Sequence, residues 1–569
     1  MKKMITYKIT AILLCLFLTV GCNDFLDEVT PQGKVPSSDY MNNEEDAEKV
    51  IIGLYELLSF TSGTGPDGVW IDNHYEFYMG NIASDDAEKG SEPMDYPDLQ
   101  MVCQYQVNSN NTLVTNFYMN GFWGVSRANF ALDHLPDAPI DAKVKQRMQG
   151  EAHFFRAYWY FYLLRHYGGM PIFRESVKVE DFGNVPRSSF SETLQFIVEE
   201  FKLAVGLLPL KGDYLPKDLG RASKGSAQGM LARVMIYAIG TDPNAAGYGA
   251  TWQALYDLTT DIIQSGQYQL APNFATLFEE ESDGGYRLES LFEYTGKDGW
   301  MNSGKVLMDW MVQGVRGGSA FGWGFNQPNQ DLVNAFDPTD PRLSCTIYGP
   351  TYNGGILYGS NTEPYNRAAA MMTDYYNRKV AVNGLMALMQ GTSKAYIVIR
   401  YADILLMRAE AAYYLGNEGE ARARVNDIRQ RARQSSYCKG YNLFSQGFDA
   451  WPPSTPNVPD LDGTVTGTAL LEAIWNERRL ELAGENFRTY DLVRTGRLVD
   501  RVGKVKDDDR VNNLPGQEAR IAGIRNNIIK SSLKHTVSVP GTGADRYIPV
   551  FPIPETEITY WNIDPNPSN

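Results

Sequence analysis

The chain has 569 residues, of which 43% are hydrophobic, 12% aromatic and 21% charged, and its formal net charge is −16 at pH 7. This length allows a large hydrophobic core in one very large domain or in several ordinary ones. The negative charge argues against DNA, RNA and anionic lipid surfaces as partners, because electrostatic repulsion opposes their approach. We therefore expect no nucleic-acid partner and an uncharged ligand.

The N-terminus has the pattern of a bacterial lipoprotein signal. Two lysines precede an apolar run from Ile9 to Val20, and Gly21-Cys22 follows it. A charged start, a short apolar stretch and a small residue before cysteine are typical of this signal. The run is shorter than the roughly 20 residues that a transmembrane helix needs, so a plain membrane anchor is less favoured. We expect residues 1–21 to be removed and Cys22 to carry the lipid.

Cysteines and sequence motifs exclude several other classes of protein. Beyond the signal and Cys22, only Cys103, Cys345 and Cys438 remain, with no CxxC pair, which allows one disulfide and excludes a disulfide scaffold. No GxxxxGK[ST], HExxH or GxSxG motif is present. The five histidines lack metal-ligand spacing, so we expect no metal site and no cofactor.

The first clear helix is predicted over residues 146–168. Its apolar face consists of Met148, Ala152, Phe155, Trp159, Tyr162 and His166. The segment ends at two glycines followed by Pro171, which is a typical C-terminal stop. This pattern predicts a long buried helix in which His166 is a core residue. Further helices are expected over residues 191–208, 222–239 and 251–263.

The clearest helical hairpin follows later in the chain. Residues 401–412 and 421–432 each present an apolar face that includes two alanines, and Gly416-Asn417 lies between them as a turn. The faces consist of Tyr401, Leu405, Ala409 and Ala412, and of Ala421, Val425, Ile428 and Ala432. A further helix is predicted over residues 470–483. Alanine at the contact positions allows two helices to approach closely, as in tetratricopeptide-like units. The sequence therefore predicts helical pairs of that kind.

Two long regions, 61–113 and 267–398, lack such periodicity. Loops of this length in a compact domain are usually functional or disordered. Their tryptophans and tyrosines argue against disorder, because disordered segments are poor in aromatic residues. We expect both regions to be irregular and ordered.

Charged residues of the helices have a structural interpretation. Glu477, Arg478, Arg479, Glu481 and Arg488 are expected to pair within or between helices rather than to act in catalysis. A second set, consisting of Arg400, Asp403 and Glu410, is expected to hold one helical pair against the next.

Several segments, taken in this order, resemble the SusD/RagB outer-membrane nutrient-binding lipoproteins of Bacteroidetes. They are CNDFLD (22–27), the aromatic helix with its YGGMP end (151–171), GRASKGSA (220–227), IRYADILLMRAEA (399–411), NERRLEL (476–482), the segment 487–494 and the proline-flanked segment 549–554. The resemblance runs from Cys22 to the C-terminus.

This resemblance implies an all-α fold, mainly of tetratricopeptide-like helical hairpins with long irregular ligand-facing loops. Residues 22–569 would form one domain, with its helical scaffold mainly in 115–265 and 395–500 and its ligand-facing regions mainly in 61–113 and 267–398. The protein would lie at the cell surface, anchored in the outer membrane through acylated Cys22. There it would bind an oligosaccharide or other nutrient and deliver it to a SusC-like TonB-dependent transporter, without enzymatic activity.

Aromatic residues of the two irregular regions are the expected ligand contacts. A sugar ring has an apolar C–H face that stacks on aromatic rings and a rim of hydroxyls that hydrogen-bond to polar side chains. The candidate ligand-binding residues are Trp70, Asp72, Asn73, Tyr75, Trp300 and Trp323. The alternative is that these side chains fill the core beneath long loops.

Three other functions compete with glycan capture. The same role could serve a peptide or another non-glycan nutrient, as the resemblance allows. A glycan-cleaving enzyme would need two carboxyls about 5 to 10 Å apart, which neighbours such as Asp85 and Asp86 rarely supply. A purely structural surface protein would bind no small molecule at all.

Overall fold

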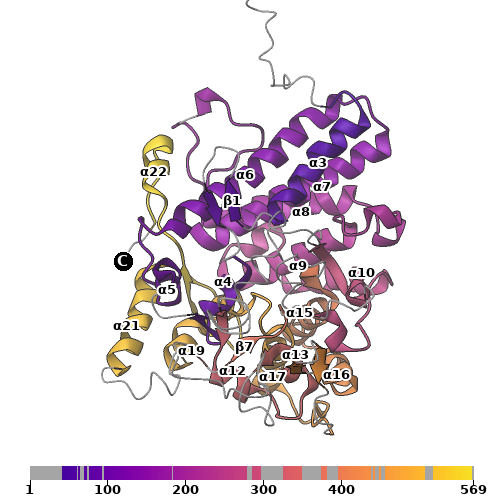
Figure 1. Ribbon diagram of the computed structural model, residues 1–569, viewed down its shortest axis with the longest axis vertical. Coiled ribbons are helices and arrows are strands. Elements are labelled where there is room, and N and C mark those ends of the chain that lie inside the picture. The colour runs from indigo at the N-terminus through magenta and orange to yellow at the C-terminus, as the bar shows by residue number, and fades with distance from the viewer. Residues whose placement is uncertain are drawn as a thin grey trace, which may run out of the picture.

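The computed structural model describes residues 41–566 apart from 60–61, 65–69, 73–75, 92–94, 182, 279–284, 296–323, 349–372, 374, 381–394, 438–439, 443–446, 450–454 and 506–516. Its long helices pack on one another from the top of Figure 1 to the bottom. They are α3 (Glu44–Ser59), α6 (Thr112–His134), α7 (Ala142–Tyr167), α8 (Phe190–Leu207), α9 (Lys224–Thr241), α10 (Trp252–Gln264), α15 (Tyr401–Tyr414), α16 (Glu418–Gln434) and α17 (Gly467–Leu482). The all-α fold predicted from the sequence is confirmed.

Helix α7 is the helix that the aromatic stripe predicts. It spans Ala142–Tyr167 against the expected 146–168. The side chain of Asp141 caps its N-terminus by accepting hydrogen bonds from two backbone N–H groups, and Gly168, at φ 78°, follows its last turn. Every residue of the stripe is buried, His166 included, which confirms the predicted core helix.

Glycines allow α6 to lie directly against α7. A Cβ atom at Gly124 would collide with the ring of Trp159, and one at Gly121 would collide with Leu163. The close approach contributes to the burial of the aromatic side chains of α7.

Helices α15 and α16 form the predicted hairpin. The turn between them contains Gly416, at φ 79°, and Asn417, whose side chain accepts a hydrogen bond from the N–H of Glu420. Ala409 and Ala421 are both fully buried where the two helices meet, and α17 covers the same seam. Tetratricopeptide-like pairing through small residues is therefore confirmed for this hairpin.

Buried ion pairs connect the helices at their contacts. Asp403 of α15 accepts hydrogen bonds from Arg233 of α9 and from Arg478 of α17. Glu410, also on α15, accepts two hydrogen bonds from Arg494, at 2.7 and 2.8 Å. The structural interpretation of these charged residues is confirmed.

Six two-stranded antiparallel sheets connect the irregular segments within the described part of the chain. They are β1 (Ser62–Thr64) with β2 (Trp70–Asp72), β3 (Ala87–Gly90) with β5 (Phe325–Pro328), β4 (Ser290–Thr295) with β8 (Ala395–Arg400), β6 (Ile347–Tyr348) with β7 (Tyr376–Asn377), β9 (Gly440–Asn442) with β10 (Gly447–Asp449), and β11 (Ser532–Thr536) with β12 (Asp545–Pro549).

The two regions expected to be irregular contain more regular structure than the sequence indicated. Short helices occur in both, besides the strands of the small sheets. They are α4 (Glu76–Ile82) and α5 (Pro97–Cys103) in the first region, and α12 (Gln330–Ala335) and α13 (Pro341–Thr346) in the second. Helices of six or seven residues are too short to show a clear apolar period, so the sequence did not indicate them.

The C-terminal part of the described chain contains α18 (Arg488–Arg494), α19 (Leu498–Val505), α21 (Gln517–Lys530) and α22 (Glu555–Trp561), of which α19, α21 and α22 lie at the left of Figure 1. No helix of the described residues combines the length and the apolar character needed to cross a membrane. Cys103 and Cys345 are both buried, and Cys438 lies outside the described residues.

Candidate functional site

Of the six predicted ligand-binding residues, the structure describes the backbone of two, Trp70 and Asp72. Trp70 and Asp72 belong to β2, which pairs with β1 and packs against α6. The remaining four candidates, and the predicted lipid-bearing residue, lie outside the described residues: Asn73, Tyr75, Trp300, Trp323 and Cys22. Their roles stay predictions.

Pairing of β3 with β5 brings the two ligand-facing regions together. Gly90 lies opposite Phe325, and the N–H of Ser91 donates a hydrogen bond to the carbonyl of Gly324 at 2.7 Å. Gly90 has φ 75°, and a Cβ atom there would collide with the same carbonyl, so glycine is required at this position. Because Trp323 immediately precedes Gly324 in the sequence, its segment ends beside the first region.

Pairing of β4 with β8 fixes the other end of that segment. Strand β4 ends at Thr295, five residues before Trp300. Its partner β8 ends at Arg400, whose buried guanidinium bonds to Glu289 and Glu481 at 2.7 and 2.6 Å. The strand before this segment is therefore joined to β8 of the scaffold, and the strand after it is joined to β3 of the first region.

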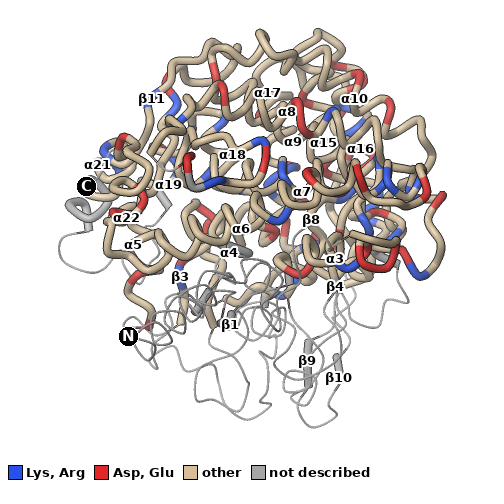
Figure 2. Tube along the Cα trace, turned by 90° about the horizontal axis from the view of Figure 1, so that it is seen from above, with Lys and Arg blue, Asp and Glu red and all other residues tan. Residues whose placement is uncertain are grey.

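An open groove of about 440 Å³ lies between α3, the segment 217–221 and β4. Figure 2 shows α3, β4 and β1 along the same side of the molecule. The groove presents the aromatic side chains of Tyr55 and Tyr294 together with polar and charged ones. The latter are Glu56, Lys217, Asp218, Arg221, Arg287 and Glu293.

The buried carboxylate of Glu151, on α7, holds the Tyr55 and Arg221 side chains that form one wall of the groove. The Tyr55 hydroxyl donates to Glu151 at 2.6 Å and accepts from the N–H of Ala222 at 2.8 Å. Arg221 forms ion pairs with two carboxylates, with Glu151 at 3.1 Å and with Asp218 at 3.0 Å. Burial raises the pKa of Glu151 to about 7, although neighbouring donors counteract the rise. Tyr55 and Arg221 are thus held in place from beneath.

The opposite wall is formed by β4. Glu293 accepts a hydrogen bond from the hydroxyl of Ser290, and burial raises the pKa of this carboxyl above its ordinary value. The Tyr294 ring lies 5.2 Å, centroid to centroid, from the ring of Tyr396 on β8. Aromatic faces beside carboxylate and guanidinium groups are the combination that a neutral, hydroxyl-rich ligand requires.

This groove was not predicted from the sequence. Helix α3 was not predicted either, although Ile51, Leu54 and Leu58 have the spacing of one helix face and three acidic residues occupy its first turn. Helix α3 supplies Tyr55, while Arg221 and Tyr294 come from distant segments. The helical periodicity could have found α3, but no local signal indicates which other segments meet it.

Asp85 and Asp86 are each bound by arginine. Arg488 bonds to both oxygens of Asp85 at 2.7 and 2.8 Å, and Arg479 bonds to Asp86 at 2.7 Å. Burial opposes ionisation of Asp85, but the surrounding arginines outweigh it and hold its pKa well below the ordinary value. This pair therefore joins α18 and α17 to the start of β3, so the structure gives Asp85 and Asp86 a structural role.

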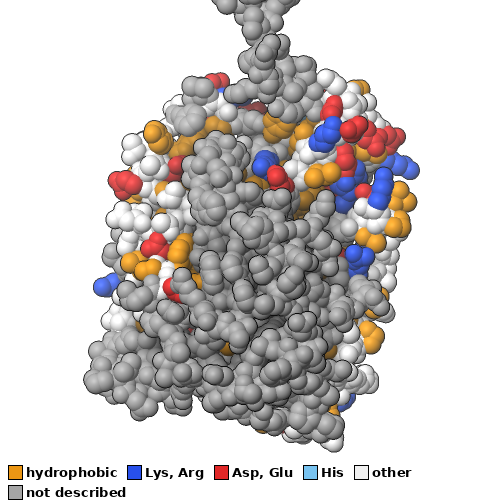
Figure 3. Space-filling model, in the orientation of Figure 1, with side chains coloured by type: hydrophobic (Ala, Val, Ile, Leu, Met, Phe, Trp, Pro, Cys, Tyr) orange, Lys and Arg blue, Asp and Glu red, His pale blue; other side chains and the backbone are white. Residues whose placement is uncertain are grey.

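Both charge signs occur together on the described part of the face seen in Figure 3. Acidic and basic side chains alternate at the upper right, over the end of the bundle formed by α3, α6 and α7. Within the described residues no group of three His, Cys, Asp or Glu side chains is arranged to hold a metal ion.

Solved structures with the same fold cover almost the whole chain. A laminarin binding SusD-like protein has a TM-score of 0.66 at 22% identity, over 93% of this chain and 100% of its own. Surface glycan-binding protein A from Bacteroides thetaiotaomicron, solved with laminarihexaose, has a TM-score of 0.65 at 17% identity, over 92% and 99%. These likenesses establish the fold.

Sequence comparisons agree with the fold. SusD-like protein P38 of Formosa agariphila is 25% identical over 89% of this chain and 94% of its own length, and a SusD-like protein of Bacteroides ovatus is 22% identical over 75% and 76%. A family model described as "Starch-binding associating with outer membrane" matches residues 24–236. The model of the SusD family matches residues 250–561, more than half of the chain. The chain belongs to the SusD family.

Proposed function

We propose that this protein binds an oligosaccharide at the cell surface and delivers it to a SusC-like TonB-dependent transporter of the outer membrane. The proposal extends to the whole chain after the signal peptide, residues 22–569, acting as one domain. It is supported above all by the β3–β5 pairing, which brings the two aromatic-containing regions together. Relatives named for laminarin binding and for surface glycan binding support a glycan as the ligand.

Capture requires no chemical change of the cargo. The rings of Trp70, Trp300 and Trp323 would stack on sugar faces, and Asp72, Asn73 and Tyr75 would bond to hydroxyls at the rim. The groove beside Tyr55 and Tyr294 would extend this surface along α3. Acyl chains on Cys22 would keep the protein beside its transporter, which raises the effective concentration of bound cargo at the pore.

Titration calorimetry against a panel of glycans tests the binding. We expect one or more β-glucans or other neutral oligosaccharides to bind without dependence on salt, because no charge attraction is involved. Peptides are included as competitors, since displacement of the glycan by a peptide would assign a different cargo. Absence of heat with every glycan would contradict the proposal, and release of reducing ends by the purified protein would indicate an enzyme instead.

Co-purification tests the transporter. The protein is extracted from its native membrane in mild detergent, and we expect a TonB-dependent transporter to elute with it. A protein that elutes alone under conditions that preserve other outer-membrane complexes would contradict the delivery role.

A further inference from the structure

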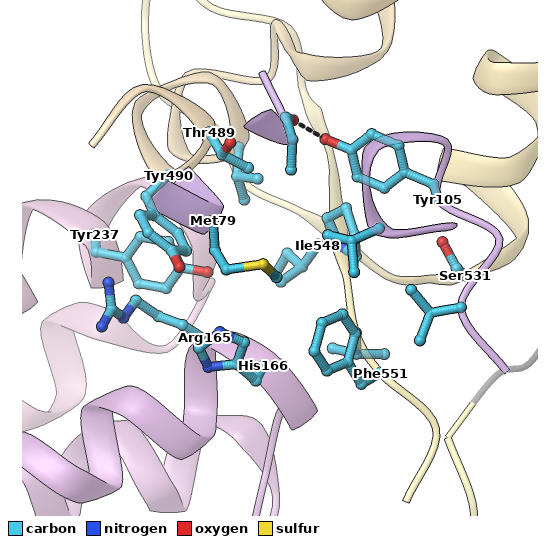
Figure 4. A pocket seen from close by; sticks show the side chains of 16 residues that line it. Met79, Tyr105, Arg165, His166, Tyr237, Thr489, Tyr490, Ser531, Ile548 and Phe551 are labelled. Carbon is cyan, nitrogen blue, oxygen red and sulfur yellow. Dashed lines mark hydrogen bonds between the residues drawn. The ribbon is translucent and has the colours of Figure 1, made fainter. Parts of the chain in front are cut away.

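Free space inside the helical scaffold is small compared with the groove. The space that Figure 4 shows between Met79, Ile548 and Phe551 measures about 60 Å³, against about 440 Å³ for the groove beside α3. Sites for small molecules usually span roughly 300 to 1,000 Å³. Of these two spaces, the groove alone has the size of a ligand site.

Five charged side chains of the described residues meet beneath one wall of the groove. Glu151 and Glu48 are both paired with Arg147 and with Arg221. Arg221 also pairs with Asp218 at 3.0 Å. Three carboxyl groups therefore share two guanidiniums, and the cluster has a surplus negative charge whenever every acid is ionised.

Glu151 is the acid of this cluster that is most readily protonated. Its side chain is 0% exposed, whereas those of Glu48 and Asp218 are 25% and 24% exposed and reach water. An ionised carboxyl is disfavoured most where water is excluded, so the surplus charge is least stable on Glu151. Burial and the Asp218 carboxylate raise the Glu151 pKa to about 7, against the opposing effects of Arg147 and Tyr55. The charge of Glu151 therefore changes near neutral pH.

Every hydrogen bond between Glu151 and the other described residues is donated to the carboxylate. Oε1 accepts from the Tyr55 hydroxyl at 2.6 Å and from Arg221 at 3.1 Å, and Oε2 accepts from Arg147 at 2.6 Å. A proton on Oε2 would point at the Arg147 guanidinium, which is itself a donor. A proton on Oε1 would compete with the protons that Tyr55 and Arg221 donate to the same atom. Protonation of Glu151 is thus incompatible with the observed set of hydrogen bonds.

The same hydrogen bonds hold the backbone of the segment that forms the wall. The Tyr55 hydroxyl accepts from the N–H of Ala222 at 2.8 Å, and the Tyr214 hydroxyl donates to the Ala222 carbonyl at 2.8 Å. The ring of Phe155, 4.6 Å from that of Tyr55, is an apolar neighbour of this contact. The titratable groups that face Glu151 come from α3 (Glu48 and Tyr55), from α7 (Arg147) and from the segment 214–222 (Tyr214, Asp218 and Arg221).

We propose that Glu151 is the positioning residue of the groove and that its protonation releases Tyr55 and Arg221 from the wall, so that the groove binds its ligand more weakly in acid. The inference rests on the proposed function, because the ligand is the glycan that the groove is proposed to help bind. A ligand that needs the ordered wall binds the form with ionised Glu151, so affinity rises with pH. Because the pKa lies at about 7, the ionised fraction falls about tenfold from pH 8 to pH 6.

Hydrogen exchange of the full-length protein in detergent tests the release of the wall without any ligand. Exchange is recorded at pH 6 and pH 8, and each rate is corrected for the intrinsic pH dependence of amide exchange. We expect protection of the segment 214–223 to be about fivefold lower, or more, at pH 6, whereas protection of α16 stays the same. Equal protection of the segment at both pH values would overturn the proposal.

Two glutamine variants separate the charge of Glu151 from general effects of pH. Glu151→Gln has the shape of the protonated form but does not titrate, so protection of the segment should be low and equal at pH 6 and pH 8. Glu199→Gln alters a side chain of α8 that is 46% exposed and is the matched control, which should keep the wild-type difference. A pH-dependent difference that persists in Glu151→Gln would refute the proposal. The wild-type exchange profile decides alone if this variant does not fold.

Titrations with the glycan that the calorimetric panel identifies connect the wall to binding. We expect affinity to be about tenfold lower at pH 6 than at pH 8 in the wild-type protein, and independent of pH in Glu151→Gln. Wild-type affinity that is the same at both pH values would show that the wall does not control binding, which contradicts the proposal. If no glycan binds, the proposed function fails, and the exchange data still decide whether Glu151 controls the wall.

Discussion

Arg400, the last residue of β8, and Glu481 of α17 form a buried ion pair in which Nη1 and Oε1 are 2.6 Å apart. Glu481 also accepts hydrogen bonds from Arg342 and Arg431. Burial alone would raise the pKa of Glu481, but the three arginines outweigh burial and hold it well below its ordinary value. One carboxylate thus connects α17 to three segments that lie far apart in the sequence.

Replacing this carboxylate should destabilise the fold strongly. Glu481→Gln leaves three buried arginines without their shared charge partner, so we expect a loss of about 3 to 5 kcal/mol in the free energy of unfolding. Asp460→Asn is the control, because Asp460 pairs with Arg433 on the surface, where an ion pair contributes about 1 kcal/mol or less. Urea denaturation compares the two variants, and equal losses would contradict a structural role for the buried cluster.

Stability should fall in acid because of Asp491. Burial opposes its ionisation, but Arg478 and Arg494 hold its pKa at about 2, below the ordinary 3.8. A carboxyl with a lower pKa in the folded state stabilises the fold above its unfolded-state pKa and loses that contribution as the pH falls through its folded-state pKa. We expect about 2 kcal/mol to be lost between pH 4 and pH 2. Asp491→Asn should flatten this part of the curve of unfolding free energy against pH, and an unchanged slope would contradict the assignment.

Two glycine substitutions should have opposite effects. Gly124→Ala places a methyl group against the Trp159 ring at the α6–α7 contact and should cost about 1 to 3 kcal/mol. Gly206→Ala, in α8 with nothing within 4 Å of the added Cβ, should stabilise the protein by about 0.5 to 1 kcal/mol. Melting temperatures of the two variants measure both effects. A stabilising Gly124→Ala would show that the two helices are not in close contact.

Glycan affinity should depend on the predicted tryptophans. Trp70→Ala, Trp300→Ala and Trp323→Ala are each expected to weaken binding of the glycan found in the titrations by about tenfold or more, since buried aromatic anchors dominate such sites. Tyr560→Ala, which removes an exposed aromatic residue of α22, is the control and should bind normally. Normal binding by all three tryptophan variants would indicate that these side chains fill the core instead.

Anchoring should depend on Cys22. In cells grown with labelled palmitate, the wild-type protein should take up the label and remain in the membrane fraction. Cys22→Ser removes the thiol that receives the lipid and should leave the protein unlabelled and soluble after fractionation. Labelling of the serine variant would place the lipid elsewhere in the chain.

Long periodic segments allowed much of the scaffold to be predicted. The helix predicted over 251–263 is α10, Trp252–Gln264, and the one predicted over 470–483 is α17, Gly467–Leu482. The aromatic stripe likewise fixed α7 within a few residues. Such helices can be predicted from the sequence because each turn repeats the same apolar spacing.

Contacts between distant segments were not predictable in the same way. Nothing local to Gly90 indicates that it pairs with Phe325, and nothing local to Arg400 indicates that Glu481 is its partner. The groove was missed for the same reason, since α3, the segment 217–221 and β4 meet only in the folded chain. The sequence indicated which regions lack helical periodicity, but tertiary packing determines how they meet.

The β3–β5 pairing also constrains how new specificity could arise or be engineered in this protein. Because Ala87 lies opposite Pro328 and Gly90 opposite Phe325, the two loops share one backbone register. Transplanting a single loop from a relative would misalign that register. A successful exchange of cargo preference therefore requires that both loops be transferred together as a matched unit.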